Sequence, residues 1–304
     1  MSAREKIILA ISWSLIVIVF LFSVVGGRWS PFGLFRGKVC IRLDDVQDHW
    51  MWQGQILLMD YCISQRVGMT IGIVSGIIGE DQRVTDRIEY GVNLGIFEIA
   101  LHGWLNENYS RMDYPQQLDL IQRGKNKLEN VFPDTTVVTF IPPMNEFNDD
   151  TLRACKEAGI QFISGTAIPQ FPKSEGTLKH FPETVQTADY YSGGIGSNWI
   201  PFSSERIIED IEDSLEKYSF AVVTLHPQQF YTWIDGSPEV IDTELFNDLV
   251  RVIDWIKNNT SPVLIRQLGS PSRFGVDSRT VVYITVGLLL IAGTVIIYRR
   301  KKSV

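Results

Sequence analysis

The chain has 304 residues, of which 45% are hydrophobic and 21% are charged, as in ordinary globular proteins. This composition excludes a disordered chain, a collagen-like fibre and a disulfide-rich miniprotein. The net charge of −7 argues against nucleic acid as a partner, because nucleic acid requires a basic surface. Cys40, Cys62 and Cys155 are too few for a disulfide framework, although one pair can form in an oxidising compartment.

Two uncharged apolar runs lie near the ends of the sequence, at residues 7–25 and 281–298. Each run is long enough to cross a hydrocarbon core of about 30 Å, and the basic residues 299–302 follow the second run. The alternative for the first run is a cleaved signal peptide, but no small-x-small cleavage site follows it. The alternative for the second run is a buried core helix, which would show a polar face.

These runs predict a two-pass protein of the cell membrane, in contact with membrane lipid. The positive-inside rule places the basic tail in the cytoplasm, and therefore places the region between the two runs outside the cytoplasm. The predicted organisation is a cytoplasmic N-terminus (1–6), a transmembrane helix (7–27), a linker (28–37), a catalytic domain (38–268), a linker (269–279), a transmembrane helix (280–298) and a basic cytoplasmic tail (299–304).

Short apolar runs alternate with longer amphipathic segments between the two linkers. The predicted strands are 39–43, 69–74, 97–101, 137–141, 161–164, 221–225 and 263–265, and the predicted helices are 50–66, 81–94, 115–131, 148–158, 204–217 and 242–258. Residues 165–202 show no regular pattern. The alternation favours a parallel sheet covered by helices, either closed into a barrel or open and doubly wound. In both architectures the active residues gather at the carboxyl ends of the strands.

Polar residues follow several predicted strands directly. Asp44 and Asp45 follow the first strand, and His102 follows the third. The turn at 142–145 follows the fourth strand, and His226 follows a later one. A hydrolytic metal site needs nitrogen or oxygen ligands, an open position for water and a nearby base, so Asp45 and His102 are candidate ligands, Asp44 a candidate base and His226 a candidate acid. The plainer alternatives are a solvated turn or helix cap for the aspartates and a core histidine for His102.

Four short motifs at these strand ends resemble, in the same order, those of the polysaccharide deacetylase family, the NodB-homology domain. They are residues 42–48, 98–104, 140–147 and 225–227, and the resemblance covers roughly residues 38–268. It implies an α/β fold, a distorted (β/α) barrel of about seven units, which the two transmembrane helices predicted from the apolar runs would flank. It also implies a hydrolase that uses a divalent metal, with zinc expected, to remove acetyl groups from nitrogen or oxygen atoms of a glycan.

The resemblance assigns roles to individual residues. Asp44 corresponds to the catalytic base, Asp45 to a metal ligand and His226 to the general acid. His102 begins the family's His-x-x-x-His metal motif, whose second histidine is replaced here by Asn106. An asparagine oxygen is a poorer zinc ligand than imidazole, so divalent ions other than zinc are also candidates for this site.

Two positions in this scheme have several candidates. The candidates for the third metal ligand are Asn106, Glu107, Asp48 and His49. The motif at 140–147 lacks the arginine that usually orients the base, and Arg42 and Arg266 are the candidates to replace it.

Three residues are predicted to contact the substrate: Trp104, Pro143 and Asn145. An aromatic ring such as that of Trp104 offers a face on which a sugar can stack, although core packing is the commoner role of such rings. A backbone N–H in the turn at 143–145 can hold a developing oxyanion.

These observations predict a membrane-anchored, metal-dependent hydrolase that removes acetyl groups from a cell-surface or envelope glycan. The first alternative is a catalytically degenerate relative that binds glycan without turnover, which the replacement at Asn106 and the missing arginine favour. The second alternative is a structural scaffold whose spans pair with partners. No oligomeric state is predicted.

Overall fold

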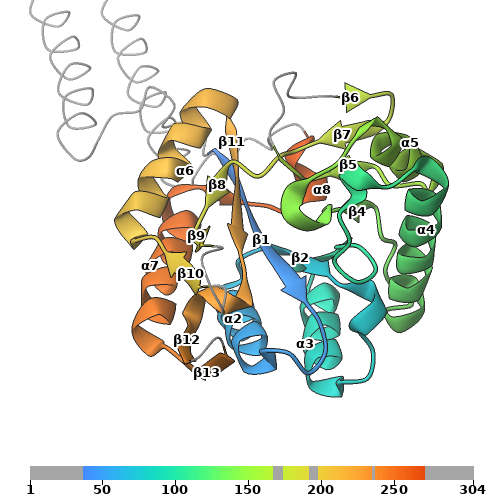
Figure 1. Cartoon of the computed structure of the whole chain (residues 1–304). Helices are drawn as coiled ribbons and strands as arrows, with labels where there is room; N and C mark the ends of the chain where they lie inside the picture. Colours follow the sequence, from blue (N-terminus) through green and yellow to red (C-terminus); the bar gives the residue numbers. More distant parts are fainter. Residues whose placement is uncertain (1–36, 167–173, 192–197, 235–236, 271–304) are drawn as a thin grey trace, which may run out of the picture. The chain divides into compact units, whose positions relative to one another are not determined.

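One curled sheet forms the centre of the described part of the chain, which the computed structural model gives as residues 37–166, 174–191, 198–234 and 237–270 (Figure 1). Its strands are β1 (Lys38–Val46), β2 (Met69–Ile73), β3 (Phe97–Leu101), β4 (Thr139–Phe140), β5 (Phe162–Ile163), β6 (Ser174–Glu175), β7 (Leu178–His180), β8 (Val185–Gln186), β11 (Phe220–Leu225) and β14 (Ser261–Pro262). The order is β6-β7-β5-β4-β3-β2-β1-β11-β8, with β14 beside the start of β1. β6 and β7 pair antiparallel, and the other ladders of the sheet are parallel.

The chain between β7 and β8 links the two edges of this sheet. The Phe181 N–H donates to the carbonyl of Ile163 at 2.9 Å, on the β5 side. Three residues later the Thr184 N–H donates to the carbonyl of Val222 in β11 at 3.2 Å. One segment therefore changes partner from one edge to the other, and the α/β fold with its curled parallel sheet is consistent with the predicted distorted barrel.

Helices surround the outside of the sheet (Figure 1). They are α2 (Trp52–Gln65), α3 (Gln82–Asn93), α4 (Tyr114–Val131), α5 (Asp149–Glu157), α6 (Ser204–Tyr218), α7 (Thr243–Asn259) and the short α8 (Ile265–Leu268). The first six begin and end within two residues of the predicted helices. Their starts are well defined in sequence because five of them carry a side-chain cap, from Asp81, Asp113, Asn148, Ser203 and Asp242.

The prediction of a strand at 263–265 is wrong. β14 ends at Pro262, and α8 begins at Ile265. The Gln267 side chain accepts a hydrogen bond from the Leu264 N–H at 3.0 Å, which satisfies a donor at the start of this turn of helix. The apolar run was too short to separate a strand from a buried helical turn.

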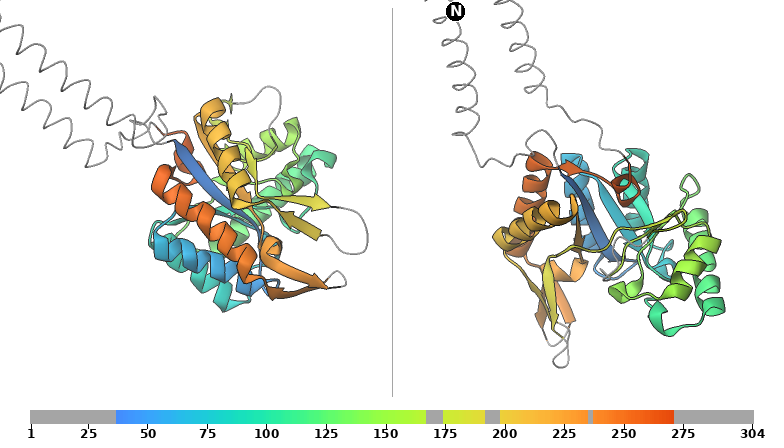
Figure 2. Two further views of the ribbon diagram at one scale, coloured as in Figure 1. Left: turned by 90° about the vertical axis from the view of Figure 1, so that its left-hand side faces the viewer. Right: turned by 90° about the horizontal axis from the view of Figure 1, so that it is seen from above.

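Two hairpins were not predicted. They are β9–β10 (Ala188–Tyr191 and Asn198–Pro201) and β12–β13 (Tyr231–Ile234 and Ser237–Ile241). Both project side by side from one end of the domain (Figure 2). The first falls in the unpatterned stretch 165–202, and strands of four or five residues leave little periodicity to detect.

The two predicted transmembrane segments, 7–27 and 280–298, lie outside the described residues, as do residues 28–36 and 271–279 of the linkers. Among the described residues, no helix is long and apolar enough to cross a membrane. The three cysteines are all buried and free, so the disulfide that the sequence allowed is not formed. Burial raises the pKa of Cys40 and Cys62 to about 12.

A buried carboxyl group lies on β3, near the amino end of the strand. Glu98 is 2% exposed and accepts hydrogen bonds from the Thr70 and Thr139 hydroxyls and from the Arg266 N–H at the start of α8. Burial outweighs these hydrogen bonds and raises the pKa of Glu98. This group joins β2, β3, β4 and α8 at the end of the sheet opposite the strand ends that carry Asp44 and His102.

The raised pKa of Glu98 predicts a specific pH dependence of stability. The folded state keeps the proton on Glu98 where the unfolded state has lost it, so the free energy of unfolding falls as the pH rises above about 4.5 and through the raised folded pKa. Glu98→Gln cannot ionise and should remove this part of the decline. The measurement is the urea midpoint of the full chain against pH, with Glu89→Gln, an exposed acid of α3, as control. A constant difference between wild type and Glu98→Gln at every pH would contradict the prediction.

Candidate active site

The site begins with an irregularity in β1. Leu43 pairs with Ile71 and Val46 pairs with Ile73, so β1 has one more residue than β2 between these pairs. Asp45 lies in this bulge with a φ of 58°, a left-handed conformation that aspartate tolerates better than most residues. In a regular strand, Asp44 and Asp45 would point to opposite faces of the sheet. The bulge turns Asp45 so that both carboxylates reach the same site.

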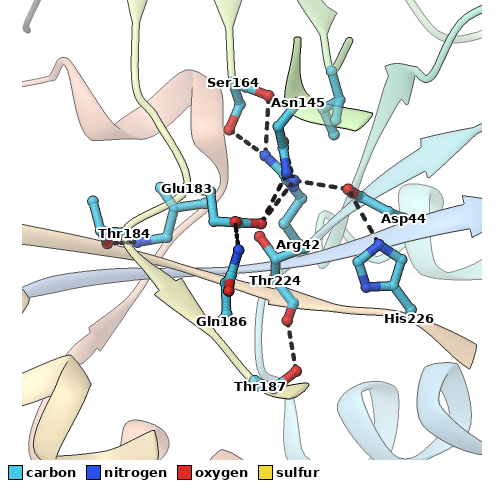
Figure 3. A network of polar contacts seen from close by, with 12 residues as sticks. Arg42, Asp44, Asn145, Ser164, Glu183, Thr184, Gln186, Thr187, Thr224 and His226 are labelled. Atoms are coloured by element: carbon cyan, nitrogen blue, oxygen red, sulfur yellow. Dashed lines mark hydrogen bonds and ion pairs between the residues drawn. The ribbon is translucent and has the colours of Figure 1, made fainter. Parts of the chain in front are cut away.

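Asp44 is held by the guanidinium of Arg42, two residues earlier on the same face of β1 (Figure 3). The Arg42 Nη2 donates to Asp44 Oδ2 at 2.7 Å, and the two side chains are 0% and 2% exposed. The other carboxylate oxygen, Asp44 Oδ1, is buried and has no hydrogen-bond partner among the described residues. Asp44 therefore has one oxygen fixed by a cation and one oxygen left for chemistry.

Three further side chains fix Arg42, and they come from distant parts of the chain (Figure 3). Ser164, after β5, accepts from Nη1 through its carbonyl and hydroxyl oxygens at 3.0 and 2.9 Å. Asn145 and Glu183 accept from Nη2 at 2.7 and 3.3 Å. The Asn145 amide also donates to Glu183 at 3.2 Å. Of the two candidates for the orienting arginine, Arg42 contacts Asp44, whereas the side chain of Arg266 is exposed on α8.

His102 faces Asp45 across the site. Its Nδ1 donates to the Ile141 carbonyl at 3.0 Å, which leaves Nε2 at 3.2 Å from Asp45 Oδ1. Burial opposes a charge on His102, but Asp44 and Asp45 outweigh it and raise the pKa of the imidazole. Burial likewise opposes ionisation of Asp45, but the hydrogen bonds from His102 and Gln228 and the nearby histidines hold the pKa of Asp45 well below its usual range.

His226, at the end of β11, completes the group. Its Nε2 lies 4.0 Å from Asp44 Oδ2, and its Nδ1 is buried without a hydrogen-bond partner among the described residues. The ring stacks on Trp199 of β10, with 4.3 Å between the ring centroids and 30° between the planes. Burial lowers the pKa of His226 in spite of the neighbouring carboxylates.

The remaining candidates for the third metal ligand lie apart from this group. Asn106 is exposed, with a φ of 79°. Glu107 accepts from backbone N–H groups of its own loop. Asp48 is buried and accepts from the N–H groups of residues 80 and 81, and His49 is 62% exposed beside the same two residues.

The three predicted substrate contacts have different surroundings. Asn145 is engaged with Arg42 and Glu183, as described above. Pro143 is buried, and a Cβ on Gly103 would lie 2.8 Å from its ring. The Trp104 ring is covered by the Arg123 guanidinium of α4, 4.0 Å from the ring centroid. That face of Trp104 is therefore not free to stack on a sugar.

The donor atoms of the site fit a divalent cation that accepts mixed nitrogen and oxygen ligands. Because Nδ1 of His102 is the donor to Ile141, a proton or a cation must lie between Nε2 and the carboxylate of Asp45. Beside them, the amide oxygen of Gln228 is buried with no hydrogen-bond partner among the described residues. Among the same residues there is no group of three or more His, Cys, Asp or Glu side chains that could hold a metal ion.

Sequence reasoning missed Ser164, Glu183 and Gln228. Ser164 is the last residue of the predicted strand 161–164, but its role was not recognised, and Glu183 lies inside the unpatterned stretch 165–202, where no strand end marked it. A signal existed for Gln228, because it follows His226 by two residues in the same turn. Fold and site together define an α/β protein with a curled parallel sheet, in which acids and histidines gather at the carboxyl ends of the strands.

Comparison with known families agrees with this class. Residues 60–163 match the family model of polysaccharide deacetylases. The predicted resemblance to this family is thereby confirmed. The matched range contains His102 and the motif at 140–147, whereas Asp44 and His226 lie outside it. Among curated proteins, no sequence matches this chain.

Solved structures share the fold at low identity. A protein from Mycobacterium smegmatis assigned to the polysaccharide deacetylases is 17% identical, with a TM-score of 0.58 over 79% of this chain and 91% of the other. A family 4 acetyl xylan esterase from Clostridium thermocellum, in complex with a cobalt ion, is 17% identical, with a TM-score of 0.50 over 76% and 89%. A CE4 family pseudoenzyme from Bacillus anthracis is 16% identical, with a TM-score of 0.52 over 79% and 69%.

The buried guanidinium of Arg42 predicts that Arg42 and its carboxylate partners contribute jointly to the free energy of unfolding. Arg42→Met would keep apolar volume but leave the buried Asp44 and the partly buried Glu183 without their counter-charge, so we expect a loss of about 3–5 kcal/mol in the free energy of unfolding. Adding Glu183→Gln should recover part of that loss, because it removes one of the two unpaired charges. The measurement is urea unfolding followed by tryptophan fluorescence, with exposed Arg266→Met as the control. A loss from Arg42→Met no larger than that of the control would contradict this account of Arg42.

Proposed function

We propose that this chain is a membrane-anchored, metal-dependent deacetylase that acts on a cell-surface or envelope glycan. The observation that supports it most is the convergence of Asp44, Asp45, His102 and His226 from three strand ends on one site. The family match and the fold shared with deacetylases support the same reaction class. The substrate would be an acetylated sugar, with the acetyl group on nitrogen or on oxygen.

Asp44 is suited to the role of base. Arg42 holds its Oδ2, which leaves the buried Oδ1 to accept a proton from the attacking water. The oxygen of that water bonds to the acetyl carbon, and the carbon–nitrogen or carbon–oxygen bond to the sugar then breaks. Asp45 and His102 would hold a divalent cation, which would supply Lewis-acid polarisation of the acetyl carbonyl.

His226 is suited to give a proton to the departing nitrogen or oxygen of the sugar. Its Nε2 lies on the Asp44 side of the site, and Trp199 fixes the plane of its ring. In the turn at 143–145, the Asn145 N–H already donates to the Pro142 carbonyl. Since proline has no N–H, Met144 carries the backbone donor of this turn that remains for the developing oxyanion.

Acetate release tests the proposed reaction. The full chain in detergent solution should release acetate from a panel of acetylated oligosaccharides, and removal of divalent metal by a chelator should abolish the release. Asp44→Asn should lower the rate by roughly 10²–10⁴-fold, because it removes the base and keeps the shape of the side chain. Asp119→Asn, an exposed acid of α4, is the control and should leave the rate unchanged.

The second candidate function is glycan binding without turnover. The observation that favours it is the exposed Asn106 in place of the family's second histidine, and one structural neighbour is a CE4 family pseudoenzyme. In that case the same panel would show binding of an acetylated oligosaccharide by wild type, no acetate release, and no effect of Asp44→Asn. That result would overturn the proposed deacetylase.

The location of the domain outside the cytoplasm is part of the proposal and rests on the apolar runs at 7–25 and 281–298. The native cysteines are buried, so an added surface cysteine can be labelled selectively. Asn93→Cys, at the exposed end of α3, should react with a membrane-impermeant maleimide in intact cells. Lys301→Cys, in the basic tail, should react only after the cells have been permeabilised. The reverse pattern would contradict the proposed orientation.

A further inference from the structure

The site contains a buried amide whose position has no role in the proposed reaction so far. Gln228 is 6% exposed and lies in the turn that follows His226. Its Nε2 donates to Asp45 Oδ2 at 2.8 Å. Its Oε1 is buried and has no hydrogen-bond partner among the described residues. A buried acceptor without a donor costs free energy, so it calls for an explanation.

The two ends of the Asp45 carboxylate therefore have different neighbours. Oδ1 faces the Nε2 of His102 at 3.2 Å, and Oδ2 faces the amide of Gln228 at 2.8 Å. The nitrogen and oxygen of an amide are nearly the same in shape, and a half-turn about the last bond exchanges them. After this exchange the carbonyl oxygen of Gln228 would face the same carboxylate, which is favourable only with a cation beside both.

We infer that Gln228, rather than Asn106, is the third protein ligand of a divalent cation held with Asp45 and His102. This inference rests on the proposed metal-dependent function and names the ligand set of the same site. Asn106 is exposed and makes no hydrogen bond or ion pair within the described part of the chain, whereas Gln228 already contacts Asp45. The backbone of Gln228 is also held in place, because its main-chain carbonyl accepts from the indole N–H of Trp233 at 3.2 Å.

This ligand set has one imidazole, one carboxylate and one amide oxygen. Carboxylate and carbonyl oxygens suit manganese and magnesium, whereas imidazole suits zinc. The site should therefore discriminate less between zinc and manganese than a site with two imidazoles. Because Gln228 and His226 share one turn, metal binding would also order the residue proposed as the acid.

Metal affinity measured by calorimetry tests the inference, with the metal-free full chain in detergent and Zn²⁺, Mn²⁺ or Co²⁺ as the probe. Gln228→Met should weaken binding at least 10-fold. Gln229→Met is the matched control, because Gln229 is an equally buried amide whose Oε1 is occupied by the Thr187 hydroxyl and the His226 N–H. Gln229→Met and Asn106→Ala should both leave the affinity unchanged.

A second variant separates ligation from support of Asp45. Gln228→Glu offers an oxygen ligand but cannot donate to Asp45, so it should keep or raise the affinity and change the visible spectrum of bound Co²⁺. If Gln228→Glu weakens binding as much as Gln228→Met, then Gln228 acts as a donor and not as a ligand, and the inference is overturned. It is also overturned if Asn106→Ala weakens binding while Gln228→Met does not.

The experiments distinguish a failure of the proposed function from a failure of this inference. Wild type that binds metal and releases acetate, with affinity unchanged in Gln228→Met, would remove Gln228 from the ligand set and leave the deacetylase intact. Wild type that binds none of the three metals would overturn the inference, and the chelator arm of the acetate assay then decides whether a deacetylase remains.

Discussion

The buried guanidinium of Arg42 is the interaction on which the site depends. It is fully buried and has two carboxylates, Asp44 and Glu183, as its counter-charges. A buried charge is costly unless it is paired and its hydrogen bonds are satisfied, and the partners of Arg42 come from β1, the end of β5, the turn after β4 and the segment between β7 and β8. The site and the closure of the sheet are thus stabilised by the same residue.

The second constraint is the bulge in β1. Without the extra residue at Asp45, the two aspartates would lie on opposite faces of the sheet. The bulge makes one strand supply both a carboxylate beside Arg42 and a carboxylate beside His102. A left-handed conformation at a residue other than glycine is a local cost, which is typical of functional sites.

Much of the scaffold was predictable from sequence. Five of the six long helices were predictable because each has an apolar stripe and a side-chain cap. The strand at 97–101 matches its prediction to the residue, because it is a short, mostly apolar segment that is fully buried and has one acid, Glu98, within it. The strands predicted at 137–141 and 161–164 shrink to two residues each, β4 and β5, because ladder pairing and not composition sets their ends.

The site was predictable where its residues directly follow predicted strands, as Asp44, His102 and His226 do. The site was not predictable where a side chain reaches it only because a distant segment closes the sheet. Glu183 reaches Arg42 because the segment between β7 and β8 crosses from one sheet edge to the other, and no local pattern in the sequence encodes that crossing. Gln228 depends in the same way on the bulge that turns Asp45 toward it.

The most direct measurement of the central claim is anomalous diffraction from crystals of the chain grown with Co²⁺. We predict one peak at roughly 2.0–2.2 Å from both Asp45 and His102 Nε2, with the Arg42–Asp44 pair in place beside it. A crystal structure from these crystals with no anomalous peak at Asp45 and His102, or with the cation at another site, would contradict the account. The strand ends that carry these residues would then not form a metal-dependent catalytic centre.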